Sequence, residues 1–522
     1  MLLHDYMEYF AGEAPHHPCV EMGGTAYSYD EANQRCNQIA HACLGAGLKR
    51  GDRFAWLSSN SIDLMLIFYA ASKIGVVPVP LNYRLAPAEW RYIINDCNAR
   101  ILVCEEEYQT GIDSIREDLE HVEHYFSAAE RDETSDAWPD IEPWIASAST
   151  HNPAQKGDPS DDLYQMYTSG TTGLPKGAIL SQSAIDANTR MIGAQFDMGL
   201  MQSRFLLVMP MFHAGASISH QVSVTNGATV IIHQNFDPIA VVEALQVKEI
   251  TNCTMVPAMI QACLVHVPNI AEKQFPHLQT MAYGASPIAV ETLREALSVF
   301  KCSFLQVFGM TETTACVTIL SPTAHHRAMS GEENLLASCG RAALGTSIRI
   351  VGENDEEVER GVIGEITVQG PQIMTSYWNL PEATASTLKD GWLFTGDAAY
   401  MDDEGFVFIQ DRIKDMIVSG GENIYSAEIE GALFEHPDII DAAVIGIPSE
   451  RWGEAVLAFV VTASGQPIQL DAIVDHCRER LAGFKLPKQV EFLAEIPRNP
   501  SGKVLKKDLR EPYWQGVARR VG

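Results

Sequence analysis

The chain has 522 residues, of which 46% are hydrophobic and 20% are charged, so it holds enough apolar material for a large core and for more than one domain. Acidic residues outnumber basic ones by 67 to 37, which gives a formal net charge of −30 at pH 7. A surface this negative repels phosphate backbones and anionic lipids, which argues against a nucleic-acid-binding or membrane-coating protein.

The cysteines and the first residues indicate the compartment. The 11 cysteines are scattered without a CxxC pair, as is typical of free thiols in a reducing environment. The start of the chain lacks a basic segment before an apolar run, and no apolar stretch is long enough to cross a bilayer. We therefore expect a cytoplasmic protein without a membrane span. The sequence leaves the oligomeric state open, and a homodimer is one of the assemblies it allows.

Over most of the chain, short apolar runs alternate with amphipathic segments. Residues 127–162 are rich in Asp, Glu, Pro and Ser, which predicts a long acidic surface connection. Such alternation indicates α/β layers with a partly parallel sheet. The apolar runs predict strands at 163–167, 205–209, 229–233, 280–283 and 304–308, and the amphipathic segments predict helices at 183–196, 238–246 and 290–300.

Near residue 412 the pattern changes. A strand at 406–410 is followed by a short charged run and a Gly-Gly turn. A helix from Ser426, strands at 443–447 and 455–461, and a helix at 471–482 then make an α+β unit of about a hundred residues. We therefore expect a large N-terminal domain over residues 1–412 and a small C-terminal domain over residues 413–522.

The strongest local signal is the segment YTSGTTGLPKGA at 167–178. Its glycines let backbone N–H groups approach an anion, its hydroxyls add donors, and Lys176 adds a positive charge. The spacing is not that of a Walker A loop. A bare Gly/Ser/Thr loop is usually a polar surface loop, but this density of donors beside a lysine favours a polyphosphate site.

This segment resembles the phosphate-binding signature of the adenylate-forming superfamily, which includes acyl-CoA synthetases, luciferases and peptide-synthetase adenylation domains. The resemblance covers about residues 160 to 510 and implies a large domain of layered sheets and helices with a small mobile α+β domain. It also implies that a carboxylic acid and ATP give acyl-AMP and pyrophosphate, after which coenzyme A displaces AMP to form a thioester. Further similar segments follow in the same order: MPMFH at 209–213, YGASP at 283–287, QVFGMTE at 306–312, GWLFTGD at 391–397, the segment 411–428, and PRNPSGK at 497–503.

The resemblance assigns residues to ATP and Mg²⁺. It makes Glu312 and Thr168 the metal residues, because Mg²⁺ prefers oxygen ligands. It makes Thr311 and Lys176 catalytic residues that contact phosphate. From the residues alone, the Thr-Glu pair at 311–312 is better explained as a helix cap. Asp397 is expected to hold the ribose with Arg412, a turn aspartate being the alternative. The other implied nucleotide contacts are Ser169, Gly170, Thr171, Thr172, Gly173, Gly284, Ala285, Ser286, Phe308 and Gly309.

The small domain is expected to serve both half-reactions. Lys503, which alone would pass for a solvated lysine, is the implied catalytic residue that stabilises charge on the phosphate during adenylation. Lys414 aligns with the family's hinge. Rotation about it would bring the turn at Gly421 toward the acyl-adenylate and open a path for coenzyme A, whose phosphates would meet Lys485 and Lys488.

The acid would enter a pocket without charged walls. The segments expected to line it, 210–219, 252–264 and 282–288, contain no Asp, Glu, Lys or Arg. A second charge on the acid would be buried there without a partner, so we expect a neutral acid, a medium- or long-chain alkyl acid ahead of an aryl or alicyclic one. The residues named for this pocket are His213, otherwise a core histidine, and Val256, Tyr283, Gly284 and Met310.

Two other functions remain to be weighed. One is the same activation followed by transfer to a carrier protein or by light-emitting oxidation; the chain ends soon after Lys503, so a fused carrier domain is not expected. The other is a non-catalytic nucleotide-binding protein, which the joint presence of Lys176, Glu312, Asp397 and Lys503 disfavours.

Overall fold

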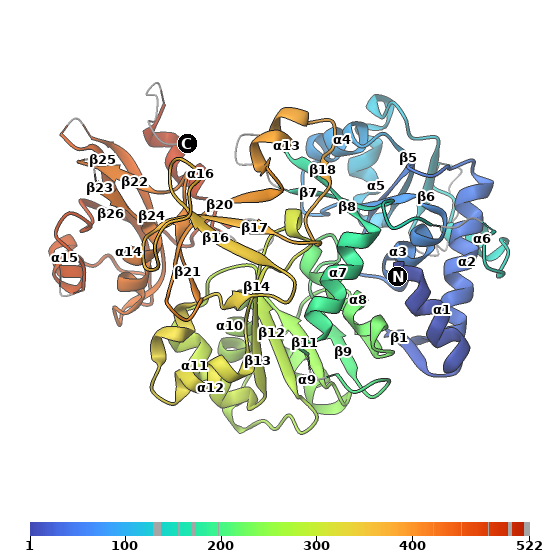
Figure 1. Ribbon diagram of the computed structural model, residues 1–522, viewed down its shortest axis with the longest axis horizontal. Coiled ribbons are helices and arrows are strands. Elements are labelled where there is room, and N and C mark those ends of the chain that lie inside the picture. Colours follow the sequence, from blue (N-terminus) through green and yellow to red (C-terminus); the bar gives the residue numbers. More distant parts are fainter. Residues whose placement is uncertain are drawn as a thin grey trace.

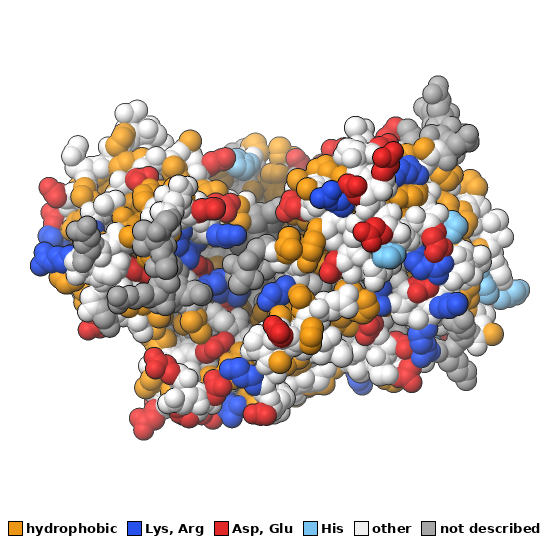
Figure 2. Space-filling view, turned by 90° about the horizontal axis from the view of Figure 1, so that it is seen from above, with side chains coloured by type: hydrophobic (Ala, Val, Ile, Leu, Met, Phe, Trp, Pro, Cys, Tyr) orange, Lys and Arg blue, Asp and Glu red, His pale blue; other side chains and the backbone are white. Residues whose placement is uncertain are grey.

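A computed structural model of the chain describes residues 1–128, 137–154, 157–168, 174–196, 198–420, 422–449, 451–478, 480–498 and 504–515. Figure 1 shows a larger lobe formed by the N-terminal and central parts of the chain and a smaller lobe, coloured red, formed by its C-terminal elements. On the face shown in Figure 2 the surface is hollowed between the two lobes, and acidic and basic side chains are interspersed.

The largest sheet of the larger lobe has nine strands in the order β15-β14-β13-β12-β11-β9-β10-β1-β2. Neighbours from β13 to β1 are parallel, while the edge strands pair antiparallel, as the mixed sequence pattern indicates. Adjacent residues of β12, Met281 and Ala282, belong to separate cores on opposite faces, which explains the continuous apolar runs. The strands are β1 (Pro18–Met22), β2 (Thr25–Ser28), β9 (Arg204–Leu207), β10 (Thr229–Ile232), β11 (Asn252–Met255), β12 (Thr280–Gly284), β13 (Ser303–Phe308), β14 (Thr318–Leu320) and β15 (Arg341–Ala342).

Helices connect the parallel strands of this sheet and cover its faces, as parallel pairing requires. Local signals set their starts. Helix α9, for example, begins at Pro238 behind Asp237, whose side chain accepts a hydrogen bond from the Ala240 N–H at 2.7 Å. The helices are α7 (Gln182–Gly193), α8 (Ala214–Thr225), α9 (Pro238–Val247), α10 (Pro257–His266), α11 (Val290–Phe300) and α12 (Pro322–Met329).

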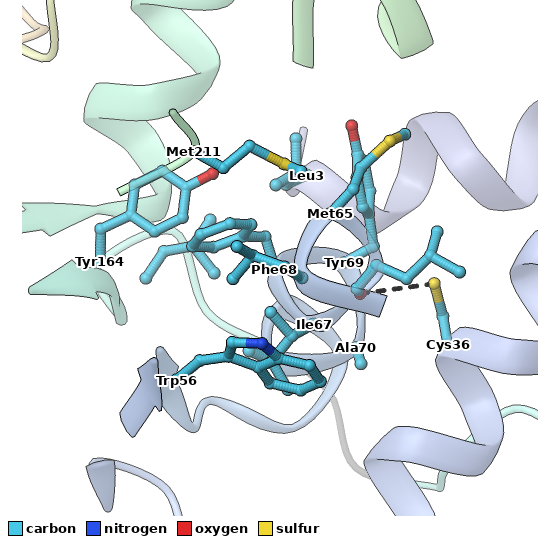
Figure 3. Close-up of a cluster of buried hydrophobic side chains, with 14 of the residues drawn as sticks. Leu3, Cys36, Trp56, Met65, Ile67, Phe68, Tyr69, Ala70, Tyr164 and Met211 are labelled. Carbon is cyan, nitrogen blue, oxygen red and sulfur yellow. Dashed lines mark hydrogen bonds between the residues drawn. The ribbon is translucent and has the colours of Figure 1, made fainter. Parts of the chain in front are cut away.

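The N-terminal part of the lobe contains a parallel sheet in the order β4-β3-β5-β6 with helices packed around it. Figure 3 shows part of the large core on this side, where the Phe68 and Tyr164 rings meet edge to face with centroids 4.3 Å apart, and Met211 reaches the same cluster. The elements are β3 (Arg53–Leu57), β4 (Val77–Pro80), β5 (Ala99–Cys104), β6 (His124–Ser127), α1 (Leu3–Glu13), α2 (Tyr29–Gly45), α3 (Ile62–Ile74), α4 (Pro87–Asp96), α5 (Glu106–Asp113) and α6 (Ile141–Ala146).

The expected surface connection at 127–162 is corrected by α6. Ile141 and Ile145 of this short helix are buried, and its Glu142 forms an ion pair with Arg35 of α2 at 2.5 Å. Trp144 also packs against the core, so three apolar residues anchor this short helix within an otherwise acidic segment.

The larger lobe contains two smaller sheets besides the nine-stranded one and the N-terminal parallel one. The three-stranded sheet β18-β8-β7 carries the phosphate segment, and the sheet β16-β17-β20-β19 continues through β21 toward the smaller lobe. The remaining elements of this region are β7 (Asp162–Thr168), β8 (Lys176–Ser181), β16 (Ser347–Val351), β17 (Gly364–Gln369), β18 (Ser376–Tyr377), β19 (Leu388–Lys389), β20 (Trp392–Met401), β21 (Val407–Arg412), α13 (Pro381–Thr387), and the 3₁₀ helices η1 (Arg116–Asp118), η2 (Ile270–Glu272), η3 (Thr311–Thr313) and η4 (Glu333–Ala337).

The smaller lobe has its own sheet, β23-β22-β25-β24 with β26, and two hydrophobic clusters composed only of residues from this lobe. The chain leaves the larger lobe at Arg412, the end of β21, and enters the smaller one at Ile417, the start of β22. The proposed domain boundary lies in this turn. The elements are β22 (Ile417–Ser419), β23 (Glu422–Ile424), β24 (Ile439–Ser449), β25 (Gly453–Thr462), β26 (Gln489–Phe492), α14 (Ser426–Phe434), α15 (Leu470–Arg478), α16 (Lys506–Arg510) and η5 (Glu511–Tyr513).

Within the described ranges, no helix combines the length and the apolar character that a membrane crossing needs.

Candidate active site

The predicted acid and adenine segments lie at one edge of the nine-stranded sheet. His213 follows β9, Val256 follows β11, Gly284 ends β12 and Phe308 ends β13. These four strands are neighbours in the order β13-β12-β11-β9, and all are parallel. Their carboxyl ends therefore meet at the same edge, which is where open α/β sheets bind ligands.

Neutral side chains dominate the acid side of this edge. Ala214, Val256, Met259 and Met310 are partly buried against the same large core cluster, although they come from separate segments of the chain. His213 precedes α8, and its ring centroid lies 4.3 Å from that of Phe212. Two predicted pocket residues, Val256 and Met310, thus pack against one core cluster, and the third, His213, directly precedes Ala214 of the same cluster.

Tyr283, also predicted for the pocket, points its side chain elsewhere. The ring is fully buried in the core beneath the sheet, and its hydroxyl lies 3.0 Å from His325 Nε2. Contact between the ring and a ligand would require breaking this interaction. Only the backbone of Tyr283 is placed at the strand end.

The adenine segments are shaped by glycine. A Cβ on Gly284 would lie 2.0 Å from the Val307 carbonyl oxygen, and one on Gly309 would lie 2.3 Å from the Ala315 carbonyl oxygen, so neither position admits a side chain. Ala285 has φ +70° and is exposed, which turns the chain sharply after β12, and Ser286 follows half-buried. Phe308 is half-buried, with its ring packed against the core of the β16-β17 sheet. At both glycines the chain therefore packs directly against neighbouring backbone, and the half-buried Phe308 precedes Gly309.

Asp397 and Arg412, predicted to hold the ribose, are direct neighbours. They occupy opposite positions on the paired strands β20 and β21, and Arg412 Nε lies 2.6 Å from Asp397 Oδ1. Asp397 is only 4% exposed, and Arg412 also donates to the Thr395 carbonyl oxygen at 3.4 Å. The pairing of β20 with β21 and the contact with Arg412 therefore fix the orientation of the Asp397 carboxylate.

The phosphate segment forms the end of a hairpin. Thr168, the last residue of β7, pairs with Lys176, the first of β8, and its hydroxyl lies 3.5 Å from the Lys176 carbonyl oxygen. The five loop residues between these strands that were predicted to bind phosphate lie outside the described residues: Ser169, Gly170, Thr171, Thr172 and Gly173. Among the described residues, Lys176 lies opposite Thr168 at the end of this strand pair.

Glu312 is not a helix cap. The 3₁₀ helix η3 begins at Thr311, and its turn is closed by Thr313, whose hydroxyl accepts a hydrogen bond from the Met310 N–H at 3.0 Å. Glu312 is 4% exposed, and its Oε1 accepts a hydrogen bond from the Tyr377 hydroxyl at 2.7 Å. The carboxylate is therefore available for a role other than capping.

Tyr377 is a site residue that the sequence did not reveal. Its ring also lies beneath Lys176, with the ammonium nitrogen 4.9 Å from the ring centroid. Burial and the nearby Glu312 carboxylate raise the pKa of the Tyr377 hydroxyl well above its ordinary value, so it stays protonated and donates. The contact depends on the pairing of β18 with β8, about which the local sequence around 377 carries no signal.

The donor set fits Mg²⁺. In the part of the chain that the structure describes, no group of three or more His, Cys, Asp or Glu residues is arranged to hold a metal. A single buried carboxylate, Glu312, with hydroxyl groups nearby suits Mg²⁺, which usually takes its other ligands from water and substrate phosphates.

The residues predicted for coenzyme A and for the hinge lie in and near the smaller lobe. The Lys485 ammonium lies 2.6 Å from the Glu428 carboxylate, and Lys488 donates to the Gly483 carbonyl oxygen at 3.4 Å. Burial lowers the pKa of Lys414 to about 8, although Asp415 opposes this shift. Gly421 and Lys503 lie outside the described residues.

Comparison with known proteins identifies the family. The pattern of the AMP-binding enzyme family matches residues 7–378, and that of the AMP-binding enzyme C-terminal domain matches residues 428–503. The fatty acid–[acyl-carrier-protein] ligase ScoC of Streptomyces coeruleorubidus is 36% identical over 520 residues, covering 98% of this chain and 96% of its own. A feruloyl-CoA synthase of an Amycolatopsis species is 36% identical over 502 residues, covering 96% of each chain.

Solved structures agree. The crystal structure of ATP-bound MatB from Rhodopseudomonas palustris superposes with a TM-score of 0.88 at 29% identity, covering 98% of this chain and 99% of that one. The family match spans most of the chain and includes the strand ends and Glu312 described above. The chain therefore belongs to the AMP-binding enzyme family, the adenylate-forming enzymes.

Proposed function

We propose that this protein is an AMP-forming acyl-CoA synthetase that activates a neutral, apolar carboxylic acid. The observation that carries the proposal is the convergence, at one sheet edge, of uncharged residues predicted for the pocket and of the tightly packed backbone at Gly284. A carboxylate and ATP react there to acyl-AMP and pyrophosphate. The thiol of coenzyme A then loses its proton and attacks the acyl carbonyl, and AMP leaves.

The described residues support the nucleotide half of this scheme. Asp397, held by Arg412, would accept hydrogen bonds from ribose hydroxyls. The base would lie beside Phe308, where Gly284 and Gly309 carry no side chain. Thr168 and Lys176 are paired at the ends of the two strands that flank the predicted phosphate-binding residues. When bound through Glu312, Mg²⁺ supplies charge neutralisation at the phosphates.

The acid half rests on the neutral wall. The carboxylate that attacks the α-phosphorus must lie near the nucleotide, so its tail extends toward Val256 and Met310. These side chains give apolar contact and no charged partner. This supports a medium- or long-chain alkyl acid as the substrate. Aryl or alicyclic acids are the alternative, which the similarity to a feruloyl-CoA synthase favours.

The second half-reaction is proposed for the smaller lobe. Lys503 would serve adenylation, and rotation about Lys414 would bring Gly421 toward the acyl-adenylate, with Lys485 and Lys488 meeting the phosphates of coenzyme A. For Lys485 this requires exchange of Glu428 for a phosphate, because the two side chains are paired in the present conformation.

A second candidate acceptor is a carrier protein. This candidate is supported by the similarity of nearly the whole chain to ScoC, a fatty acid–[acyl-carrier-protein] ligase. Both acceptors present the same phosphopantetheine thiol, so the adenylation step is common to the two proposals. The free cysteines, all buried or half-buried, support a location in the reducing cytoplasm. ATP and coenzyme A are both supplied there.

The test is a product assay with a panel of acids from acetate to dodecanoate, together with ferulate, benzoate and succinate. We expect AMP and pyrophosphate in equal amounts, with kcat/KM rising about fourfold per added methylene, since each buried CH₂ contributes about 0.8 kcal/mol, until the pocket is full. Mass spectrometry with coenzyme A and with holo-carrier protein identifies the acceptor. Formation of ADP and phosphate would contradict the reaction, and a preference for acetate or succinate would contradict the pocket.

A further inference from the structure

A short segment ties the phosphate hairpin to the Glu312 turn. We call residues 372–378 the strap. On one side, the strap's Met374 N–H donates to the Glu312 carbonyl oxygen at 2.8 Å, and on the other its Trp378 N–H donates to the Gly177 carbonyl oxygen at 2.8 Å. Strand β18, within the strap, pairs with β8. Two parts of the site that are more than a hundred residues apart in sequence are thereby held in one register.

Tyr377 is the strap residue that points into the site. Its hydroxyl donates to Glu312 Oε1 at 2.7 Å, and its ring carries the Lys176 ammonium 4.9 Å from its centroid. Both Tyr377, at 6% exposure, and Glu312, at 4%, are shielded from water. A single side chain thus contacts the predicted metal ligand and the predicted phosphate contact.

This arrangement solves an electrostatic problem. A half-buried lysine and a buried glutamate placed side by side attract each other, and a direct pair would withdraw both from a nucleotide. Within the described ranges no ion pair joins Lys176 to Glu312. The aromatic face instead gives Lys176 a weaker cation–π partner, and the hydroxyl occupies one oxygen of Glu312. The other carboxylate oxygen keeps a fixed direction, which a metal ligand needs.

We propose that Tyr377 is a positioning residue that orients Glu312 for Mg²⁺-ATP and holds Lys176 apart from it. The inference rests on the proposed function, because it takes Glu312 as the metal ligand. It assigns to the strap a role in metal affinity, in addition to its role in joining two sheets.

The test uses Tyr377→Phe, which keeps the ring, its burial and the contact with Lys176 and removes only the hydroxyl. Binding of Mn²⁺ in the presence of α,β-methylene-ATP is measured by electron paramagnetic resonance, and binding of AMP without metal by calorimetry. We expect the Mn²⁺ affinity to fall about tenfold, the value of losing one hydrogen bond to a charged group, while AMP affinity stays unchanged. The apparent KM for Mg²⁺ in the adenylation step should rise while kcat at saturating Mg²⁺ is largely kept.

Two further variants separate the outcomes. Tyr164→Phe removes a buried hydroxyl from the same three-stranded sheet, where it bonds to Gln221, and should leave Mn²⁺ affinity unchanged. Glu312→Gln should abolish most Mn²⁺ binding; if it does not, the metal assignment of the proposed function fails. If Glu312→Gln loses the metal but Tyr377→Phe binds Mn²⁺ as tightly as the unaltered protein, or loses AMP affinity equally, the role proposed for Tyr377 is wrong.

Discussion

At the scale of single residues, buried histidines of the larger lobe are held neutral by their surroundings. His325 is 2% exposed; its Nδ1 lies 2.9 Å from the Ser321 carbonyl oxygen, and its Nε2 faces the Tyr283 hydroxyl. Because a carbonyl only accepts, Nδ1 carries the proton and Nε2 accepts from the tyrosine. Burial lowers the pKa of His325 to about 4, and that of His220 to about 3.

This predicts a defined pH dependence for His325. The folded protein binds the proton with a pKa of about 4, and the unfolded chain with an ordinary value of 6.5. Between these values the unfolded state holds more protons, so stability is complete above pH 6.5 and is lost as the pH falls toward 4. The loss amounts to a few kcal/mol at most, since one pKa unit corresponds to about 1.4 kcal/mol.

The measurement is urea unfolding of the unaltered protein and of His325→Gln at intervals from pH 7 to 4. Glutamine is neutral throughout and can keep a donor and an acceptor, so the variant should lose less stability over this range. Parallel curves for the two proteins would show that His325 protonation does not contribute.

The residues of the site differ in how far sequence could anticipate their contacts. Asp397 and Arg412 were expected to act together, and a tight strand pair makes them neighbours. The Tyr283 ring was expected in the pocket, but strand alternation turns it into the core instead. Tyr377 and Glu428 were missed because their partners, Glu312 and Lys485, lie far away in the chain.

At the scale of elements, the end of β21 serves two sites at once. Successive residues of a strand face opposite sides, so Arg412 turns toward Asp397 while Asp411 turns toward the smaller lobe. Asp411 Oδ2 accepts hydrogen bonds from the Ser426 N–H at 2.6 Å and from the Ser426 hydroxyl at 2.5 Å. This carboxylate therefore caps α14 from the preceding lobe.

A half-buried lysine completes the contact around Asp411. Lys506 of α16 lies 2.9 Å from Glu430 of α14 and 4.0 Å from Asp411. Burial lowers the pKa of Lys506, but the two carboxylates more than compensate and leave it raised. The charges form one network in which each member needs the others.

Removal of Asp411 should therefore weaken the attachment of α14. We expect Asp411→Ala to destabilise the smaller lobe by about 1–3 kcal/mol, because the Ser426 N–H and Lys506 lose a charged acceptor. Asp403→Ala is the matched control, since Asp403 is an exposed carboxylate in the turn before β21. Hydrogen–deuterium exchange of peptides from the smaller lobe, measured at intervals of urea concentration, compares the two variants. Equal stability of both would contradict the cap.

Element boundaries were predictable where the apolar pattern is dense. Helix α11 occupies the predicted residues Val290–Phe300, and β9, β10, β12 and β13 lie within a few residues of expectation. Helix α6 was missed, since it is only six residues long and few apolar residues anchor it. The two-residue strands β15, β18 and β19 were not predicted either, because a strand that short is defined by the strand it pairs with and not by its own sequence pattern.

At the scale of the whole molecule, the two lobes have separate cores and are joined by the turn at 413–416. Arg510 of α16 binds this turn by pairing with Asp415 and by donating to the Lys414 carbonyl oxygen at 3.4 Å. The layered α/β architecture and the existence of a small C-terminal unit were predictable from the sequence pattern and its change near residue 412. The orientation of the lobes was not, because few contacts and no motif determine it.

A reaction with two half-reactions makes opposite demands on this turn. Lys503, three residues before the half-buried Lys506, would serve adenylation. Thioester formation would instead need the smaller lobe rotated about Lys414. Lys414→Pro restricts φ at that position and the conformation of the residue before it. We expect pyrophosphate exchange with ATP and acid to stay near normal, and conversion of supplied acyl-AMP with coenzyme A to fall by about tenfold or more, since the lobe no longer turns freely.

Two companion variants decide how this result is interpreted. Lys414→Ala removes the same side chain without restricting the backbone, so it should retain most of the thioester step if rotation is what the proline blocks. Lys503→Ala should show the reverse pattern, with exchange reduced by about 10²–10³-fold, the usual effect of losing one charge-stabilising donor, and thioester formation largely spared. If each variant impaired both half-reactions equally, a single fixed arrangement of the lobes would serve both, and the hinge at Lys414 would be wrong.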